Sequence, residues 1–333
     1  MLTNCPQCGY EFDASPGRAG LKAVCPRCKR SFDAFAIGET IEIDRESGDV
    51  RKTGPHAPVG SASGRQFQEY RLVEEIGRGG MGVVYKAIQE TLGRPVALKM
   101  IITGEAARED EIKRFMAEAS AVARLRHPNV VNIHELDVSE GTYYYTMDFI
   151  EGRDLGQLIC EKGMDQRRAA ILALKVARAL AHTHSKHIVH RDLKPGNIII
   201  DEMGEPVLTD FGLACDVRAM EGGSANAAGT PEYMAPEQVL GRLERVGPAT
   251  DIYSLGALLY EMLVGRPPFQ AESIDELFKK ISEDDPEPLE RLKPELSPGL
   301  CEIVARCLNK DPDARFASAR DLAEALGAWL RAT

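Results

Sequence analysis

The segment at residues 190–212, HRDLKPGNIIIDEMGEPVLTDFG, places polar residues at both ends of a stretch whose middle is apolar. Two apolar runs, Ile198–Ile200 and Pro206–Thr209, flank the turn sequence DEMG, so the segment is predicted to fold back as a β-hairpin. Asn197 directly precedes the first strand and Asp210 directly follows the second, so folding back brings them side by side. An amide oxygen and a carboxylate placed together are oxygen ligands suited to Mg2+.

Two more polar residues of this segment have the chemistry of phosphoryl transfer. Asp192 lies five residues before Asn197, near enough to accept a proton from a substrate hydroxyl. Lys194 can neutralise a phosphoryl group in transit. Phosphoryl transfer depends mainly on positioning and charge stabilisation, and these residue types supply both.

A glycine pattern occurs in IGRGGMGVVYKA (76–87), where Gly77, Gly79 and Gly82 form G-x-G-x-x-G. β-branched and aromatic residues follow, which predicts a turn between two strands and not the strand-to-helix turn of a dinucleotide fold. Such a hairpin can lie over a nucleotide, because glycine lets the backbone approach the phosphates closely. Taken alone, the pattern also fits an ordinary glycine-rich turn.

Lys99 ends the apolar strand VALK, where an unpaired ammonium is costly. A helix is expected over residues 108–125, and Glu118 lies beside its apolar stripe. That stripe consists of Ile112, Phe115, Ala119 and Val122. A carboxylate beside a buried stripe needs a cation, so Lys99 and Glu118 are predicted to pair, with a purely structural ion pair as the alternative.

A separate signal lies near the N-terminus, where CPQCGYEFDA (5–14) and CPRCKRSFDA (25–34) repeat the pattern CPxCxxxFDA. The spacing C-x2-C-x16-C-x2-C fits a four-thiolate zinc site, and the segment resembles short bacterial zinc ribbons. The predicted ligands of Zn2+ are Cys5, Cys8, Cys25 and Cys28. So short a segment buries little core, so metal binding would supply its folding energy. A redox CxxC motif is the alternative, although that chemistry calls for one motif and not two matched ones.

Composition and charge limit what the whole chain can be. It is 44% hydrophobic and 28% charged, as expected of a soluble globular protein. Its 51 acidic and 41 basic residues give a net charge of −10, which disfavours general binding to nucleic acid or anionic membranes. No uncharged apolar run reaches the ~18 residues of a membrane span. The N-terminus lacks the pattern of a secretion signal, so a cytoplasmic protein is expected.

The order of patterns along the chain predicts its domains. Residues 47–64 are rich in Gly, Ser and Pro and are typical of a flexible linker. After them, strand-like segments come first and helical segments follow, which predicts an α+β architecture in two lobes. The expected divisions are a zinc ribbon at 1–36, a linker at 37–67, and a domain at 68–331 with lobes at 68–150 and 151–331.

Residues 70–330 resemble a eukaryotic-like protein kinase of the serine/threonine type common in bacteria. The matching motifs are the glycine-rich loop, VALK, Glu118, HRDLKPGN (190–197), DFG (210–212), APE (235–237), DIYSLG (251–256) and Arg315 in DPDARF. The resemblance implies the two-lobed protein kinase fold, ATP and Mg2+ as cofactors, and proteins with serine or threonine hydroxyls as substrates.

The resemblance also implies roles for residues. Asp192 would be the catalytic base, assisted by Lys194, and Asn197 and Asp210 would hold Mg2+. Lys99 would hold the α- and β-phosphates and pair with Glu118. The residues implied to surround ATP are Ile76, Gly77, Gly79, Gly82, Val84, Ala97, Lys99, the gatekeeper Met147, the hinge residues Asp148, Phe149 and Ile150, and Asp154 at the ribose.

Structural and specificity roles follow from the same resemblance. Glu237 and Arg315 are implied to form a structural ion pair, and Lys194 and Thr230 are typical of serine/threonine kinases. An apolar spine that joins the lobes, in which the histidine is not catalytic, is implied for Val122, Ile133, His190 and Phe211.

Alternatives remain for the function and for its control. A nucleotide-binding pseudokinase scaffold would lack one of Lys99, Asp192, Asn197 or Asp210, and all four are present. In a second alternative, the kinase fold regulates a zinc ribbon that binds nucleic acid; the ribbon could equally bind a protein. The activation segment, residues 210–237, has few hydroxyls, and Ser224 is the expected site if phosphorylation orders it.

Overall fold

The structure is a computed structural model of the 333-residue chain. Two compact units, Met1–Gly64 and Arg65–Thr333, make up the chain. The structure describes the backbone of short strands within the first 51 residues and, beyond them, residues 64–79, 82–101, 112, 115–116, 119–120, 122–139, 141–159, 163–211 and 231–333.

In the first unit the strand pairing recurs after 20 residues, as the CPxCxxxFDA motif does. Its strands pair antiparallel as β1 (Leu2–Asn4) with β2 (Glu11–Asp13), β3 (Lys22–Val24) with β4 (Ser31–Asp33), and β5 (Glu42–Ile43) with β6 (Val50–Arg51). Leu2 pairs with Asp13 and Lys22 pairs with Asp33, so the second hairpin repeats the register of the first 20 residues later. The four cysteines of the repeat lie outside the described residues.

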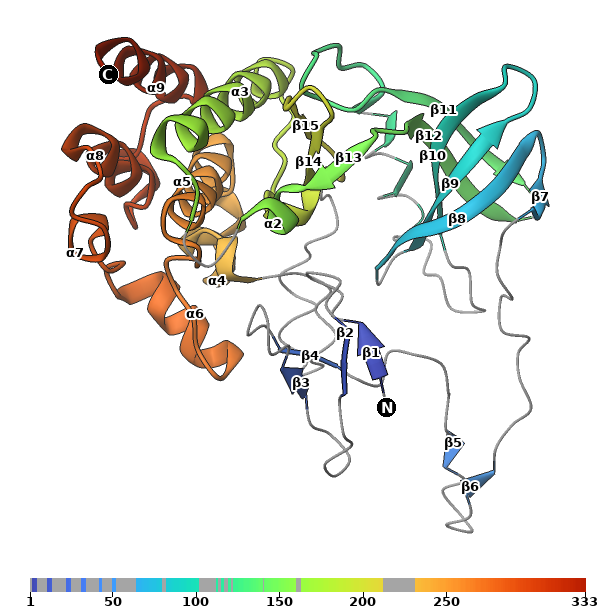
Figure 1. The fold of residues 1–333 in the computed structure, drawn as a ribbon, viewed down its shortest axis with the longest axis horizontal. Helices are drawn as coiled ribbons and strands as arrows, with labels where there is room; N and C mark the ends of the chain where they lie inside the picture. Colours follow the sequence, from blue (N-terminus) through green and yellow to red (C-terminus); the bar gives the residue numbers. More distant parts are fainter. Residues whose placement is uncertain are drawn as a thin grey trace. The chain divides into compact units, whose positions relative to one another are not determined.

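The second unit begins with a strand-rich lobe. Its six-stranded sheet has the order β11-β12-β10-β9-β8-β7, with every neighbouring pair antiparallel, and curves strongly in Figure 1. The strands are β7 (Gln66–Phe67), β8 (Tyr70–Gly79), β9 (Gly82–Gln89), β10 (Arg94–Ile101), β11 (Ile133–Ser139) and β12 (Thr142–Asp148).

A helix is present in the region where the sequence predicts one, over 108–125. Among its described residues, those in helical conformation are Ile112, Phe115, Met116, Ala119, Ser120 and Val122. Phe115, Ala119 and Val122 are buried, as the apolar stripe predicts. Glu118 lies outside the described residues.

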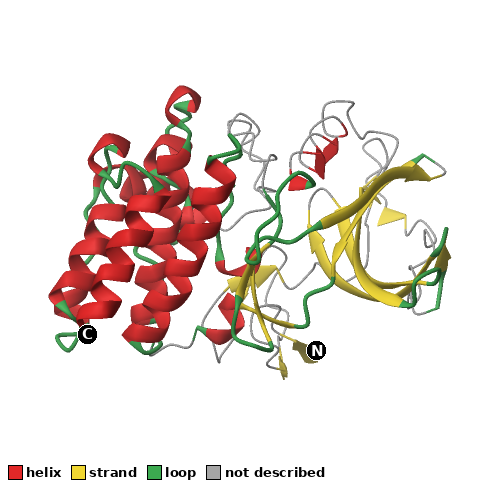
Figure 2. Cartoon of the chain, turned by 90° about the horizontal axis from the view of Figure 1, so that it is seen from above, coloured by secondary structure: helices red, strands yellow, loops and turns green. Residues whose placement is uncertain are grey.

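The second lobe is mostly helical, and Figure 2 shows its long helices packed side by side, apart from the strands of the first lobe. It begins with a small antiparallel sheet in the order β13-β14-β15, built from β13 (Gly152–Asp154), β14 (Ile198–Asp201) and β15 (Pro206–Leu208). The α-helices are α2 (Leu155–Leu158), α3 (Gln166–His184), α4 (Pro236–Val239), α5 (Pro248–Val264), α6 (Ile274–Glu283), α7 (Leu289–Leu292), α8 (Pro298–Cys307) and α9 (Ala319–Ala332). Short 3-10 turns lie at Pro195–Asn197, Pro231–Tyr233, Leu243–Arg245 and Pro312–Ala314.

Helix α5 is the centre of the second lobe. Every residue from Thr250 to Leu263 is buried, which is the pattern of a helix surrounded by other elements and not of a surface helix. Gly256 permits a close approach to α8, because a Cβ there would lie 2.4 Å from Cβ of Cys307. The helix ends at Gly265, whose left-handed backbone favours glycine.

A short segment other than the hinge at residues 148–150 also connects the two lobes. This bridging segment, Asn129–His134, leads from the first helix into β11, and its backbone pairs with β15. The N–H of Val131 donates to the carbonyl of Leu208 at 3.0 Å, and the N–H of Leu208 donates to the carbonyl of Asn129 at 3.0 Å. Nδ2 of Asn129 also donates to the carbonyl of Pro206 at 2.8 Å.

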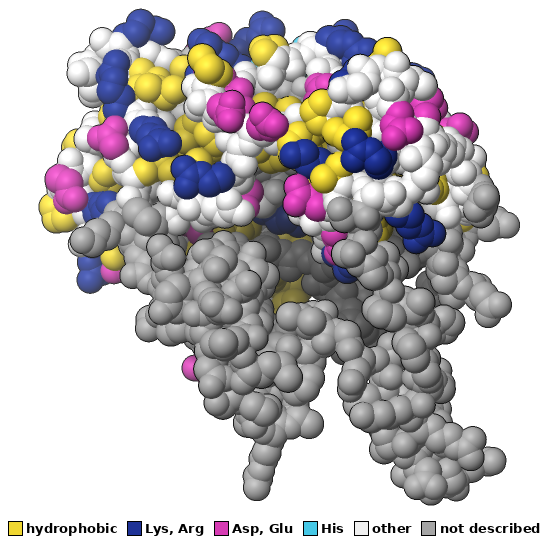
Figure 3. Space-filling model, turned by 45° about the vertical axis from the view of Figure 1, so that its right-hand side comes forward, with side chains coloured by type: hydrophobic (Ala, Val, Ile, Leu, Met, Phe, Trp, Pro, Cys, Tyr) yellow, Lys and Arg dark blue, Asp and Glu magenta, His cyan; other side chains and the backbone are white. Residues whose placement is uncertain are grey.

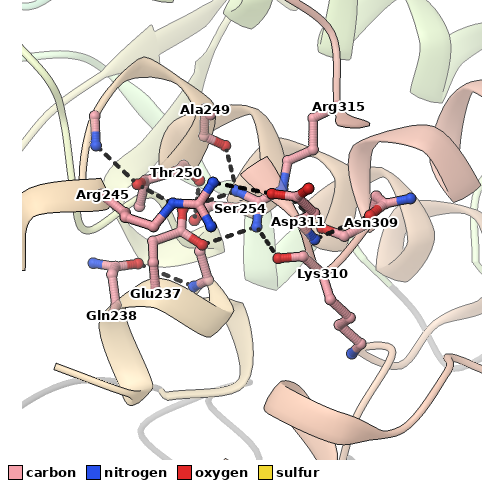
Figure 4. Close-up of polar contacts among 12 residues, drawn as sticks. Glu237, Gln238, Arg245, Ala249, Thr250, Ser254, Asn309, Lys310, Asp311 and Arg315 are labelled. Atoms are coloured by element: carbon pink, nitrogen blue, oxygen red, sulfur yellow. Dashed lines mark hydrogen bonds and ion pairs between the residues drawn. The ribbon is translucent and has the colours of Figure 1, made fainter. Parts of the chain in front are cut away.

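The ion pair predicted between Glu237 and Arg315 is confirmed (Figure 4). The guanidinium donates two parallel hydrogen bonds to the carboxylate, both 2.8 Å long, and the two side chains are 0% and 1% exposed. Arg315 also donates to the carbonyls of Asn309 and Ala249, and Glu237 accepts from the hydroxyl of Thr250. Both buried charges are therefore compensated by several hydrogen bonds.

No helix within the described residues is long and apolar enough to cross a membrane.

We expect Arg315→Met to lower the free energy of unfolding by about 3–5 kcal/mol, because it leaves the buried carboxylate of Glu237 without its cation. Urea denaturation followed by circular dichroism would measure this loss.

The matched control for that variant is Arg245→Met. Arg245 also pairs with two carboxylates, those of Asp311 and Asp313, but all three side chains are at least 36% exposed. Exposed ion pairs contribute little, so the control should unfold close to the parent. Equal losses in both variants would contradict the role given to burial.

Candidate active site

The glycine-rich stretch forms the hairpin of β8 and β9, as the sequence predicts. Gly79 pairs with Gly82 across its end, and residues 80 and 81 lie outside the described residues. At Gly82 a side chain is excluded, because a Cβ would lie 2.2 Å from the carbonyl oxygen of Met100. Ile76, near the end of β8, is 45% exposed, although large apolar side chains are usually buried.

Lys99 contacts the second lobe. It lies in β10, and its Nζ is 2.7 Å from Oδ1 of Asp210, while the lysine side chain is 17% exposed. Burial raises the pKa of the Asp210 carboxyl, but the charge and hydrogen bond of Lys99 outweigh burial, so this pKa lies below its usual value. The carboxylate is therefore ionised at neutral pH. The predicted partner Glu118 lies outside the described residues.

The hairpin expected after Asn197 is present. Ile198 of β14 pairs with Leu208 of β15, and the N–H of Thr209 donates to the carbonyl of Asn197 at 2.9 Å. This places Nδ2 of Asn197 3.5 Å from the carbonyl oxygen of Asp210. The structure thus brings together the amide and the carboxylate residue, as the fold-back predicts.

The loop before this hairpin gathers two polar side chains around Asp192. Nζ of Lys194 donates to Oδ2 of Asp192 at 2.6 Å. Nδ2 of Asn197 donates to the same oxygen at 3.0 Å and to the carbonyl oxygen of Asp192 at 2.8 Å. The carboxylate is therefore held from two sides, with its side chain still 25% exposed.

Asp251 of α5, which is fully buried, also fixes this loop. Its Oδ2 accepts the N–H of His190 at 2.9 Å, and its Oδ1 accepts the N–H of Arg191 at 2.9 Å. Nε2 of His184 lies 2.7 Å from Oδ2. These contacts hold Arg191 in a left-handed backbone conformation with φ at 65°.

His190 packs between the lobes and does not face the candidate catalytic carboxylate. Its Nε2 donates to the carbonyl of Thr209 at 3.1 Å, and its ring lies 4.6 Å from that of Phe211. Burial is the main cause that lowers the pKa of His190 below its usual value. A neutral, buried imidazole in this position serves packing, in keeping with the expected spine, whose other members Val122 and Ile133 are also buried.

The expected adenine site lies where β12 ends. Met147 is buried and pairs with Ala97 of β10 on one side and with Ile133 of β11 on the other. Asp148, Phe149 and Ile150 follow it into the second lobe. Nζ of Lys86 lies 4.4 Å from the ring centroid of Phe149.

The carboxylate of Asp148, the last residue of β12, contacts the bridging segment. Its Oδ2 accepts Nδ2 of Asn132 at 2.7 Å and the N–H of Asn132 at 3.3 Å, while Oδ1 lies 3.0 Å from Nε2 of His134. The pairing of β11 with β12 shifts register between Ile133 and Glu135, so His134 sits in a β-bulge. Burial is the main cause that lowers the pKa of His134, so a neutral imidazole donates this bond near pH 7.

Asp154 and Val84 lie at the edges of the site. Oδ1 of Asp154 accepts the N–H of Gln157 at 3.0 Å and caps α2, so this carboxylate already has a structural partner. Val84 of β9 is partly buried and pairs with Lys99.

Other sequence expectations lie elsewhere. Thr230, Ser224 and the four paired cysteines are outside the described residues. Among the residues that are described, no group of three or more His, Cys, Asp or Glu could hold a metal ion. Two histidines near the end of α3 have contacts of another kind. His184 contacts Asp251, and the ring of His182 lies 5.4 Å from that of His127.

Asp251, Asn132 and His134 hold the site through contacts that the sequence pattern does not predict. A buried aspartate in a largely apolar helix is a usable signal for Asp251, because such a residue needs polar partners. The contacts of His134 depend on a bulge, which leaves no periodic signal.

The comparisons with known proteins agree with this geometry. The family model of the protein kinase domain matches residues 70–326. The chain is 35% identical over 255 residues to the serine/threonine-protein kinase PrkC of Bacillus subtilis, an alignment that covers 76% of this chain and 39% of PrkC. It is 36% identical over 266 residues to PknA of Mycobacterium tuberculosis (78% and 61%) and 37% identical over 287 residues to PkaA of Streptomyces coelicolor (81% and 50%), both serine/threonine-protein kinases.

The chain therefore belongs to the protein kinase domain family. Its curated relatives of the bacterial serine/threonine type are the class that the motifs predict, so that part of the resemblance is confirmed. The chain spans between about two fifths and three fifths of the length of these relatives.

We expect Asp148→Ala to raise the KM for ATP about tenfold with little change in kcat, because it frees the strand end from Asn132 and His134. Steady-state kinetics over a range of ATP concentrations would measure both constants. Asp137→Ala is the control, since Asp137 is an exposed β11 residue whose carboxylate accepts the N–H of its neighbour Val138. A parent-like KM for Asp148→Ala would show that this anchor does not position the nucleotide.

Proposed function

We propose that the chain is a serine/threonine protein kinase that transfers the γ-phosphate of ATP to protein hydroxyls and that phosphorylates itself in bacterial signalling. The observation that carries this proposal is the continuous set of polar contacts from Lys99 through Asp210 and Asn197 to Asp192 and Lys194. Both lobes contribute to it. Each group that positions a phosphate, a metal ion or a hydroxyl is therefore within reach of the next.

Asp210 and Asn197 fit Mg2+ by their chemistry. Their oxygens are a carboxylate and an amide, the hard ligands that this ion takes, and the low pKa of Asp210 supports the charged form. When bound there, Mg2+ would neutralise charge on the ATP phosphates. Lys99 would bind the α- and β-phosphates from the opposite lobe, and the glycine-rich hairpin of β8 and β9 would cover them.

Asp192 would accept the proton of the substrate hydroxyl. Its two neighbours, Lys194 and Asn197, both contact Oδ2, which orients the carboxylate. Lys194 can also place its positive charge beside the transferred phosphoryl group, as the loose transition state of this reaction requires. The adenine would lie against Val84 and Ala97 and bond to the backbone of Asp148, Phe149 and Ile150, with Asp154 near the ribose.

The serine/threonine preference rests on Lys194 and on the names of the relatives. The pseudokinase alternative is disfavoured by the presence of Lys99, Asp192, Asn197 and Asp210 and by the contacts that connect them.

The first test is Asp192→Asn. We expect phosphoryl transfer to fall at least about a hundredfold, because an amide cannot accept the proton, while ADP binds as in the parent, because Asp192 is not a phosphate ligand. Transfer of labelled phosphate and calorimetric titration with ADP measure the two quantities.

Asp275→Asn, a change at an exposed aspartate in the first turn of α6, controls for the loss of one negative charge. Undiminished transfer in Asp192→Asn would remove this residue from its proposed role. A parent protein that binds ADP but never transfers phosphate would favour the pseudokinase scaffold.

For the N-terminal unit we propose a zinc ribbon with Cys5, Cys8, Cys25 and Cys28 as ligands. Two observations support it: the spacing of the cysteines and the two hairpins of identical register, each of which has a CxxC sequence between its strands. Such a pair of matched turns is typical of four-thiolate zinc sites.

We expect the partner of the zinc ribbon to be a protein and not a nucleic acid. The chain is acidic overall. On the face drawn in Figure 3, the basic and acidic side chains of the described residues are interspersed around hydrophobic ones, and do not form a continuous basic stripe. Retention of the full chain on immobilised nucleic acid in moderate salt would reverse this preference.

Elemental analysis should find one zinc ion per full-length chain, and a fragment that starts at residue 65 should lose the zinc and keep its basal kinase activity. The fragment corresponds to the second compact unit. Cys5→Ser in the full chain should also lose the metal, because three thiolates do not close a structural site. Full zinc content in the fragment would contradict the assignment.

A further inference from the structure

Strand β12 contains three consecutive tyrosines, and two of them point to opposite faces of the sheet. Tyr144 is fully buried, and its ring lies 5.1 Å from that of Phe67 and 6.2 Å from that of Tyr70. Successive side chains alternate between the faces of a strand, so Tyr145 lies on the other face. That face is the one on which Lys99 stands, because Tyr145 and Lys99 are direct partners in the pairing of β12 with β10.

Tyr145 contacts both the candidate phosphate-binding lysine and the first helix. Nζ of Lys99 lies 5.8 Å from the centroid of the Tyr145 ring, within the range of a cation–π interaction. The Tyr145 ring also lies 5.0 Å from that of Phe115, at an angle of 38°. Tyr145 and Phe115 are only 3% and 6% exposed, so both contacts are shielded from water.

Contacts with neighbouring side chains are needed to hold the ammonium group of Lys99 in one position. Its side chain is long and flexible, and fixing its rotamers has an entropy cost. The salt bridge to Asp210 holds the ammonium from one direction. An aromatic face beside the ammonium adds a further contact, and this contact is stronger at the 17% exposure of Lys99 than it would be in open solvent.

The ring also connects Lys99 to the helix. Movement of the helix would carry Phe115 against or away from Tyr145, and Tyr145 is cross-strand neighbour to Lys99. The stack Phe115–Tyr145–Lys99 therefore connects the helix to the ammonium group by two contacts.

We propose that the aromatic ring of Tyr145 is a positioning residue for phosphate binding: it holds the Lys99 ammonium in place and couples that place to the first helix. This inference rests on the proposed role of Lys99 as a ligand of the ATP phosphates. It concerns the ring, and Tyr145→Phe therefore keeps the function.

The test compares ADP with adenosine, which lacks phosphates, by calorimetric titration of full-length protein. Tyr145→Leu should weaken ADP binding roughly five- to tenfold and leave adenosine binding within about twofold, because the lost contact acts on the phosphates through Lys99. Tyr145→Phe should bind both ligands as the parent does. Tyr144→Leu is the matched control: it removes a tyrosine from the adjacent position on the opposite face, and it should lower the melting temperature without changing the ratio of the two affinities.

If Tyr145→Leu does not fold, fluorinated phenylalanines at position 145 replace it, since they keep the shape and weaken the negative face of the ring. ADP affinity should then fall stepwise with the number of fluorine atoms while adenosine affinity stays constant.

Parent-like ADP binding in the leucine variant or across the fluorinated series would overturn the inference, as would an equal loss for ADP and adenosine. A parent protein that binds no ADP would instead contradict the proposed function itself, so the two failures are distinct.

Discussion

The carboxylate of Asp251 is the contact on which the arrangement of the candidate active site depends. A charge buried in the first turn of α5 is costly unless hydrogen bonds compensate it. Here the compensation comes from the backbone N–H groups of His190 and Arg191 and from the ring of His184. The most buried helix of the lobe thereby fixes the main chain just before Asp192. The hydrogen bonds of the Asp251 carboxylate thus both stabilise the core and place the candidate base, Asp192.

Backbone strain occurs at two positions beside the candidate catalytic groups. Arg191 has a φ of 65° and Asp210 a φ of 47°, values that side chains other than glycine seldom adopt. Both are held by contacts from other elements: Arg191 by Asp251, and Asp210 by Lys99 of the opposite lobe. Such conformations persist only where the surroundings determine them, and they orient the residue that follows or carries the chemistry.

The sequence was informative where chemistry and periodicity coincide. The fold-back of Asn197 and Asp210, the strand–turn–strand form of the glycine-rich stretch and the pair of Glu237 with Arg315 could all be predicted, because each follows from local pattern or from the family motifs. The anchoring of Asp148 by Asn132 and His134 could not, because a bulge sets it and a bulge breaks the alternation of a strand. The stack on Tyr145 also escaped prediction, since it joins three elements that are distant in sequence.

The bridging segment Asn129–His134 determines how the two lobes can move. Although its last two residues begin β11, its backbone is bonded to β15 of the helical lobe at Asn129 and Val131, while Asn132 holds the end of β12. The end of β12 is therefore tied to the helical lobe through this segment. Rotation of the sheet about such an anchor would displace each part in proportion to its distance from the axis. Asp148, bonded to the anchor, would then be displaced less than strands β8 and β9.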